Sequence, residues 1–203
     1  MRKWNFSPGP ATIPEDVLSE VQSELLEFNN SGISIMEMSH RTELYSSIAF
    51  EAKKDFIEIL NIPDNYEVLF LQGGATHQFS MIPMNFSHLK GKPAYITTGT
   101  WTKRAFEEGS KITEIDQIFT SENMNFIYAP DFKDLIIPED ASYVHYCPNE
   151  TIHGVSFKHI PTISNPLVAD MSSSILSEPI DINKFSLIYA SAQKNIGPSG
   201  LTV

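Results

Sequence analysis

The chain has 203 residues and a formal net charge of −11, which is enough for one domain with a hydrophobic core. So acidic a chain is not expected to bind nucleic acid or anionic membranes, because both require Lys and Arg to neutralise phosphate. The single cysteine, Cys147, excludes an internal disulfide and a cysteine-based metal site. No signal peptide or bilayer-length apolar run is present, so we expect a cytoplasmic protein.

Two helices are predicted in the first third of the chain. Thr12 and Glu15 have the spacing of a capping box, and apolar residues then recur at helical spacing, which predicts a helix from there to about residue 28. A second helix is predicted over residues 44–60, where an Asn and a Pro follow as stop signals. Residues 1–14 are expected to form an N-terminal segment that precedes a large domain over residues 15–203.

The rest of the chain alternates between short apolar runs and helical stretches. Because the apolar runs have no polar face, they indicate an α/β fold with a mostly parallel sheet flanked by helices. Residues 111–140 give no clear pattern, and residues 200–203 resemble the start of one more buried strand. Strands are expected over residues 68–71, 94–98, 143–147, 166–170 and 186–190, and helices over residues 78–86 and from about 100 to 109.

Ligands of such sheets bind beyond the carboxyl ends of the strands, where this chain carries several chemically informative residues. The Gly73–Gly74 turn before a helix suits a phosphate, although a plain tight turn explains it equally well. Trp101 could stack on a planar ring or simply pack in the core. Asp170 could pair with a pyridinium nitrogen or cap a helix. Lys194 could be a desolvated Schiff-base nucleophile or a solvated loop lysine.

These features are more informative together than singly. A phosphate turn, a stacking aromatic residue, a strand-end aspartate and then a lysine, in that order, describe a site for pyridoxal 5′-phosphate. No recognised metal-ligand spacing is found around His145, Cys147 and His153, so no metal site is expected.

Longer stretches of the chain resemble the phosphoserine aminotransferase family, whose members are class V, fold-type-I enzymes that depend on pyridoxal 5′-phosphate. The resemblance runs from about residue 4 to the end, and its last two stretches are specific to the family. The stretches are Asn5–Ala11, Met36–Arg41, Tyr146–Gly154 and Ala192–Pro198. The resemblance implies a homodimer with the large-domain fold of the aspartate aminotransferase type.

The resemblance also implies the reaction, in which an amino group is exchanged between phosphoserine and 2-oxoglutarate to give 3-phosphohydroxypyruvate and glutamate, as in serine biosynthesis. In bacteria such an enzyme can also act on 4-phosphohydroxythreonine in pyridoxine biosynthesis. Lys194 would form the Schiff base with the cofactor and later shuttle a proton, and Asp170 would pair with the ring nitrogen. Trp101 would stack on the ring, and Thr151 would contact the phenolic oxygen.

The remaining roles implied by the resemblance concern anionic groups. Ala75, Thr76 and Gln193 would hold the cofactor phosphate, and Arg41 with His40 would bind the distal anionic group of the substrate. Some members carry an Arg where this chain has Thr76, and the adjacent His77 is a candidate substitute.

The family members are roughly twice as long, in line with two-domain enzymes, so we expect this chain to lack the small domain and, by itself, to be inactive or badly folded. Two alternatives stay open. One is another class V enzyme, such as an alanine–glyoxylate-type aminotransferase or a desulfurase. The other is a non-catalytic truncated domain.

Overall fold

The computed structural model describes residues 2–86 and 88–203, and within them the chain forms a parallel five-stranded sheet. The strand order is β2-β1-β3-β6-β7, and each neighbouring pair is parallel. A two-stranded antiparallel hairpin, β4 with β5, follows β3. The strands are β1 (Ala94–Thr97), β2 (Asp116–Thr120), β3 (Val144–Tyr146), β4 (Asn149–Glu150), β5 (Val155–Ser156), β6 (Leu167–Asp170) and β7 (Leu187–Tyr189).

Alternation along the central strands divides the core into two layers. Helices α3 and α4 cover one face, where Tyr95, Tyr143 and Val168 pack against Phe79 of α3. The other face, which includes Ile96, is covered by loops, short 3-10 helices and the end of α2. The helices are α1 (Glu15–Glu24), α2 (Glu43–Leu60), α3 (Gly74–Phe86) and α4 (Thr100–Gly109), and the 3-10 helices are η1 (Ile35–Glu37), η2 (Glu122–Met124), η3 (Phe132–Asp134) and η4 (Ile182–Lys184).

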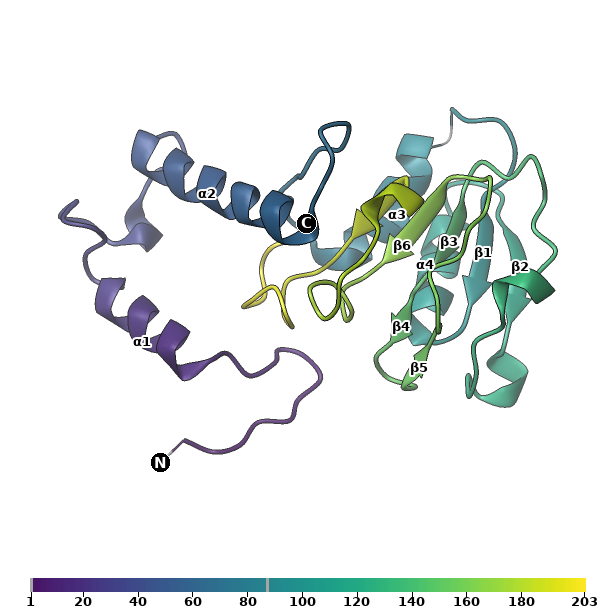
Figure 1. Cartoon of the computed structure of the whole chain (residues 1–203), viewed down its shortest axis with the longest axis horizontal. Coiled ribbons are helices and arrows are strands. Elements are labelled where there is room, and N and C mark those ends of the chain that lie inside the picture. The colour runs from purple at the N-terminus through teal and green to yellow at the C-terminus, as the bar shows by residue number, and fades with distance from the viewer. Residues whose placement is uncertain (1, 87) are drawn as a thin grey trace.

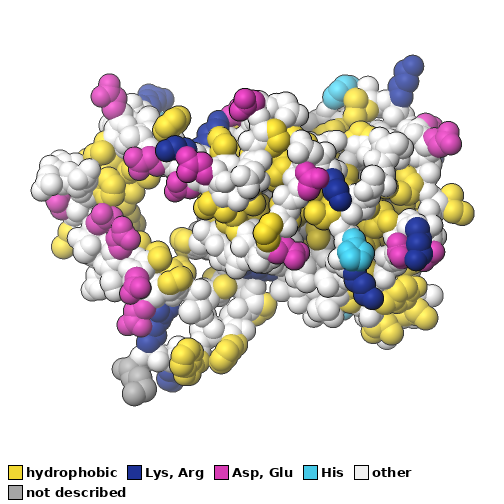
Figure 2. Space-filling view, viewed as in Figure 1, with side chains coloured by type: hydrophobic (Ala, Val, Ile, Leu, Met, Phe, Trp, Pro, Cys, Tyr) yellow, Lys and Arg dark blue, Asp and Glu magenta, His cyan; other side chains and the backbone are white. Residues whose placement is uncertain are grey.

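The chain from its N-terminus through α1, η1 and most of α2 forms an arm that stands away from the sheet (Figure 1). None of the residues of α1 is buried, and Figure 2 shows open space between this arm and the body that contains the sheet. Large apolar side chains are exposed along the arm, among them Trp4, Phe6, Val21 and Phe50. The arm thus presents apolar surface that this chain does not itself cover.

The predicted α/β fold with a mostly parallel sheet is confirmed, and so is the helix over residues 44–60, which begins one residue earlier. The Thr42 hydroxyl caps α2 by accepting a hydrogen bond from the Tyr45 N–H. The helix ends where Asn61 adopts a left-handed conformation, with φ of 49°.

Two local predictions need correction, and one strand was not predicted. The Thr12 hydroxyl caps no helix, because it donates to the carbonyl of Asn5 at 2.6 Å instead, and α1 begins only after Pro14. The apolar run over residues 68–71 is not a strand, since within it Leu71 forms only an isolated bridge to Thr202. The segment over residues 111–140, which gave no pattern, contains β2, a half-buried strand at the edge of the sheet.

No helix within residues 2–86 and 88–203 is long and apolar enough to cross a membrane. The boundary between an N-terminal segment and a large domain at residues 14 and 15 coincides with the start of α1, and the division itself stays a prediction.

Candidate active site

Lys194 lies in the loop that follows β7, five residues beyond the end of that strand. Its side chain is half-buried, and Nζ donates a hydrogen bond to the Thr151 hydroxyl at 2.5 Å. Burial lowers the pKa of Lys194 because it disfavours the charged ammonium, whereas the negative charge of Asp170 opposes this shift. A lysine with a lowered pKa offers more neutral amine at neutral pH and is therefore a better nucleophile.

Asp170 is the last residue of β6, the strand that pairs with β7. The two strands are parallel neighbours, and the crossover between them contains the short helix η4 and no α-helix. The carboxyl group is only 4% exposed, and one oxygen accepts a hydrogen bond from the Ser172 N–H at 3.0 Å. Burial raises the pKa of Asp170, so its charge is stable only beside a positive partner.

Trp101 lies in the first turn of α4 and is half-buried. Its backbone N–H donates to the Glu150 carboxylate at 3.1 Å, and the guanidinium of Arg104 lies 5.6 Å from its ring centroid. Glu150 directly precedes Thr151, which holds Lys194. A hydrogen bond therefore links α4, which carries Trp101, to the segment that contains Thr151, the hydrogen-bond partner of Lys194.

The turn before α3 has the backbone that a phosphate site requires. Gly73 and Gly74 have φ of +95° and +65°, which side chains rarely adopt, and Ala75 and Thr76 follow in the first turn of α3. A Cβ placed on Gly74 would lie 3.5 Å from the Ser191 hydroxyl, so this helix terminus adjoins the segment that leads to Lys194. The unpaired N–H groups of a first helical turn attract anions.

His77 lies in the same turn of α3. It is exposed, and its ring occupies the space above Gly73 where a Cβ would stand. Its role as a substitute for the Arg that some family members carry stays a prediction.

The N-terminal segment contributes a close contact that the sequence did not indicate. The N–H of Ala11 donates to the carbonyl of Gln193 at 2.8 Å. A Cβ on Gly9 would lie 3.2 Å from Lys194 Cε and 3.5 Å from Gln193 Cγ. Gly9 has φ of +151°, so both conformation and space favour glycine there. The proline–glycine pattern in Asn5–Ala11 was the available signal, but nothing in it identified its neighbour.

His40 and Arg41 lie in the turn before α2 and are exposed. Within residues 2–86 and 88–203, no hydrogen bond or ion pair joins either side chain to Lys194 or Asp170. The structure thus brings together the predicted lysine, aspartate, threonine and tryptophan, with the α3 turn beside them, and it leaves the predicted substrate-binding pair apart.

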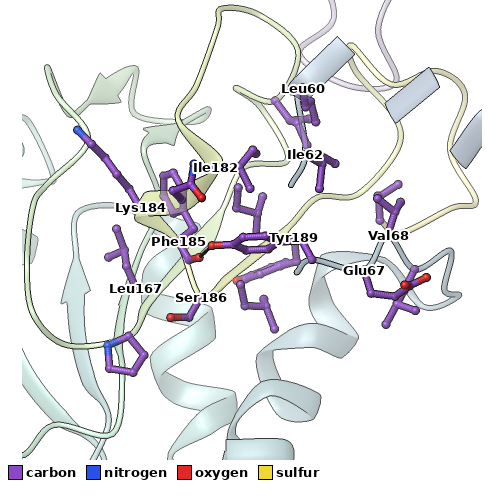
Figure 3. Close-up of a pocket in the computed structure, with 18 of the residues that line it drawn as sticks. Leu60, Ile62, Glu67, Val68, Leu167, Ile182, Lys184, Phe185, Ser186 and Tyr189 are labelled. Atoms are coloured by element: carbon purple, nitrogen blue, oxygen red, sulfur yellow. Dashed lines mark hydrogen bonds between the residues drawn. The ribbon is translucent and has the colours of Figure 1, made fainter. Parts of the chain in front are cut away.

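A cavity of about 750 Å³ lies elsewhere, between the end of α2, residues 65–71 and β7 (Figure 3). It is lined largely by apolar side chains such as Leu60, Ile182 and Tyr189, and the Tyr66 hydroxyl donates to the carbonyl of Phe185 at 2.5 Å within it. None of the predicted site residues lines this cavity. The candidate site is therefore defined by the chemistry of its residues and not by this cavity.

The part of the chain that the structure describes contains no cluster of His, Cys, Asp or Glu suited to a metal ion.

The family model for class V aminotransferases matches residues 3–203. The chain belongs to the class V aminotransferases.

Relatives within this family are named phosphoserine aminotransferases. The protein of that name from Bacillus cereus (strain ATCC 10987) is 52% identical over all of this chain and 56% of its own length, and the one from Hahella chejuensis (strain KCTC 2396) is 48% identical over the same shares. The solved phosphoserine aminotransferase from Bacillus circulans subsp. alkalophilus superposes with a TM-score of 0.94 at 44% identity, covering 99% of this chain and 56% of that one. This class V aminotransferase chain thus spans about half the length of the relatives it matches.

Proposed function

We propose that this chain is the cofactor-binding part of a phosphoserine aminotransferase, which transfers an amino group between phosphoserine and 2-oxoglutarate with pyridoxal 5′-phosphate. One observation carries the proposal. In a chain about half identical to named phosphoserine aminotransferases, the loop after β7 presents a lysine of lowered pKa beside a buried aspartate.

The residues present match the chemical groups of pyridoxal 5′-phosphate. A nucleophilic amine at Lys194 suits its aldehyde, and the buried carboxylate of Asp170 requires a positive partner such as a protonated ring nitrogen. The indole of Trp101 can stack on its ring. The N-terminus of α3, with Ala75 and Thr76, suits its phosphate. When bound, this group supplies an electron sink for the bonds at the substrate Cα.

The protein's own residues would then do the following. Lys194 Nζ provides the amine that anchors the cofactor and afterwards carries a proton to and from the substrate Cα. The Thr151 hydroxyl, which accepts a hydrogen bond from Nζ, orients that amine and contacts the phenolic oxygen. The carboxylate of Asp170 holds a proton on the ring nitrogen. Gln193, whose backbone is fixed by Ala11, joins the phosphate-binding residues.

We further propose that Arg41, with His40 beside it, binds the anionic end of the substrate, because a guanidinium can hold a carboxylate or phosphate through two hydrogen bonds. Since neither side chain contacts Lys194 within this chain, the proposal includes a homodimer in which a second copy supplies them. The exposed apolar side chains of the N-terminal arm support such an interface. Action on 4-phosphohydroxythreonine, a cytoplasmic location and the division at residues 14 and 15 complete the proposal.

The proposal is tested by borohydride reduction of the protein after incubation with pyridoxal 5′-phosphate, followed by mass spectrometry of the intact protein and its peptides. We expect one cofactor adduct, on the peptide that contains Lys194. The adduct should disappear in Lys194→Arg and persist in Lys158→Arg, an exposed lysine given the same substitution. A parent protein without this adduct, with cofactor in excess, would refute cofactor binding and favour a non-catalytic domain.

Substrate class is tested by competition between phosphoserine and alanine in the whole dimeric aminotransferase of which this chain would form the cofactor-binding part. We expect phosphoserine to be the preferred amino donor, and this preference to be lost in Arg41→Ala. A preference for alanine would instead assign the protein to another branch of the class V enzymes.

A further inference from the structure

Glu150 is a fully buried carboxylate at the N-terminus of helix α4. Its side chain has no exposed surface, and it accepts three hydrogen bonds from the first turn of that helix. The backbone N–H of Trp101 donates to Oε2 at 3.1 Å. The N–H and the hydroxyl of Thr102 donate to Oε1 at 2.9 and 2.6 Å. Each oxygen is thus engaged, and the negative charge lies at the positive end of a helix.

The neighbouring backbone leaves room for this carboxylate and for little else. A Cβ on Gly99, the residue that caps α4, would overlap the carboxyl group of Glu150 and stand 2.6 Å from its Cγ. Gly99 has an extended backbone, so its glycine is explained by the close approach of Glu150 and not by conformation. Gly99 and Glu150 therefore form a matched pair across the contact between α4 and β4.

The two residues beside Glu150 are tied to other parts of the same site. Asn149 donates from its side-chain amide to the Ser173 hydroxyl at 2.8 Å, and that hydroxyl donates back to the Asn149 carbonyl at 2.6 Å. Ser173 follows Asp170 closely in the chain. On the other side, Thr151 holds Lys194. The consecutive residues 149–151 thus contact, in that order, the loop after Asp170, the helix α4 that carries Trp101, and the loop that carries Lys194.

We propose that Glu150 is a positioning residue that fixes Trp101 at the angle and depth required to stack on the cofactor ring, acting through the backbone of α4. The inference rests on the proposed function, because the stacking partner is the proposed cofactor. A carboxylate suits the task better than an amide does. Both of its oxygens accept hydrogen bonds, whereas a glutamine would direct its NH₂ group at one of the two backbone N–H donors.

The test uses the Trp4→Phe protein, in which Trp101 is the only remaining tryptophan. Trp4 is 89% exposed, so its replacement does not disturb the core. Acrylamide quenching and the emission maximum of Trp101 are measured without cofactor in this parent, in Glu150→Gln and in Glu107→Gln. Glu107 is an exposed residue of α4, so its variant makes the same change of charge on the helix that Glu150 contacts, but outside that contact. Cofactor affinity is measured separately by equilibrium dialysis.

We expect Glu150→Gln to raise the quenching of Trp101 about twofold and to weaken cofactor binding about tenfold, because hydrogen bonds to a charged acceptor are lost. Glu107→Gln should match the parent in both measurements. If Glu150→Gln does not fold, as judged by far-UV circular dichroism, Glu150→Asp and Gly99→Ala provide the same readout. The aspartate retains the charge on a shorter side chain, and the alanine displaces an unaltered carboxylate.

Failure of the proposed function and failure of the positioning role give different results. A parent that binds no cofactor refutes the proposed function, whereas the quenching measurement still tests whether Glu150 fixes Trp101. A folded Glu150→Gln protein with parental quenching and parental cofactor affinity overturns the positioning role. A variant that loses thermal stability while both readouts stay parental has the same meaning, because Glu150 would then be structural only.

Discussion

Mild acid should destabilise this protein through one histidine in the core. His145 lies on the central strand β3, is 1% exposed, and shares a hydrogen bond of 2.8 Å between its Nε2 and the Tyr189 hydroxyl. Its ring also stacks on Tyr95, with centroids 4.5 Å apart. Burial lowers the pKa of His145 from 6.5 to about 3, because the charged imidazolium cannot be solvated there.

The pKa difference sets both the sign and the size of the effect. The unfolded chain takes up a proton near pH 6.5, whereas the folded chain resists it until about pH 3. The contribution of His145 to stability is therefore complete above pH 6.5 and is lost as the pH falls through this window. Each pH unit costs about 1.4 kcal/mol, so acidification from pH 7 to pH 5 should cost about 2 kcal/mol.

The assay is urea unfolding followed by far-UV circular dichroism at pH 7 and pH 5, in the parent and in His145→Gln. A glutamine side chain can donate to the Tyr189 hydroxyl or accept from it but does not titrate, so the loss of about 2 kcal/mol between the two pH values should disappear. His77→Gln is the matched control, because that histidine is exposed. Asp170 acts in the opposite sense, since burial raises its pKa, and comparison with the variant cancels its contribution. Equal pH dependence in the parent and in His145→Gln would refute the reasoning.

Two further substitutions act at the candidate site. Asp170→Asn should lower the pKa of Lys194, because it removes the carboxylate charge that favours the ammonium; the measurement is the pH dependence of Lys194 labelling by an amine reagent, and an unchanged midpoint would contradict it. Gly9→Ala should slow cofactor attachment to Lys194 severalfold, because its Cβ would crowd Cε at 3.2 Å and its φ is strained, at a cost of about 1 kcal/mol or more. Gly32→Ala, also at positive φ but in open space, should leave the attachment rate unchanged, and equal slowing in both would count against a local effect.

The sheet could be predicted from the sequence because its central strands are buried on both faces. β1 and β6 are buried at every position, so each appears as a short, mainly apolar run that ends in one polar residue. β2 could not be found this way, since it lies at the edge of the sheet and contains only half-buried and exposed residues. The run at residues 68–71 was wrongly predicted as a strand because an apolar segment need not lie in a sheet. It is apolar, but part of it lines the cavity beside β7, and only Leu71 forms a bridge.

The site was predictable where chain topology alone determines it. Asp170 ends one strand and Lys194 follows the next strand along the chain, and the two strands are parallel neighbours, so the proximity of the two residues could be inferred from the order of elements. Gly9 and Glu150 could not be placed, because each acts on a residue far away in the sequence. Glu150 reaches a helix 48 residues earlier, and Gly9 meets the loop of Lys194 near the other end of the chain.

The hairpin after β3 explains how a short segment can serve several parts of the site. Successive side chains of an extended segment point in opposite directions, so Asn149 and Glu150 can reach Ser173 and α4 respectively while Thr151 turns toward Lys194. Such an arrangement fixes the register of the segment, because a shift by one residue would break all three contacts at once. The effects on stability of substitutions at Asn149, Glu150 and Thr151 should therefore be strongly coupled to one another. Single substitutions in the edge strand β2 should leave the site intact.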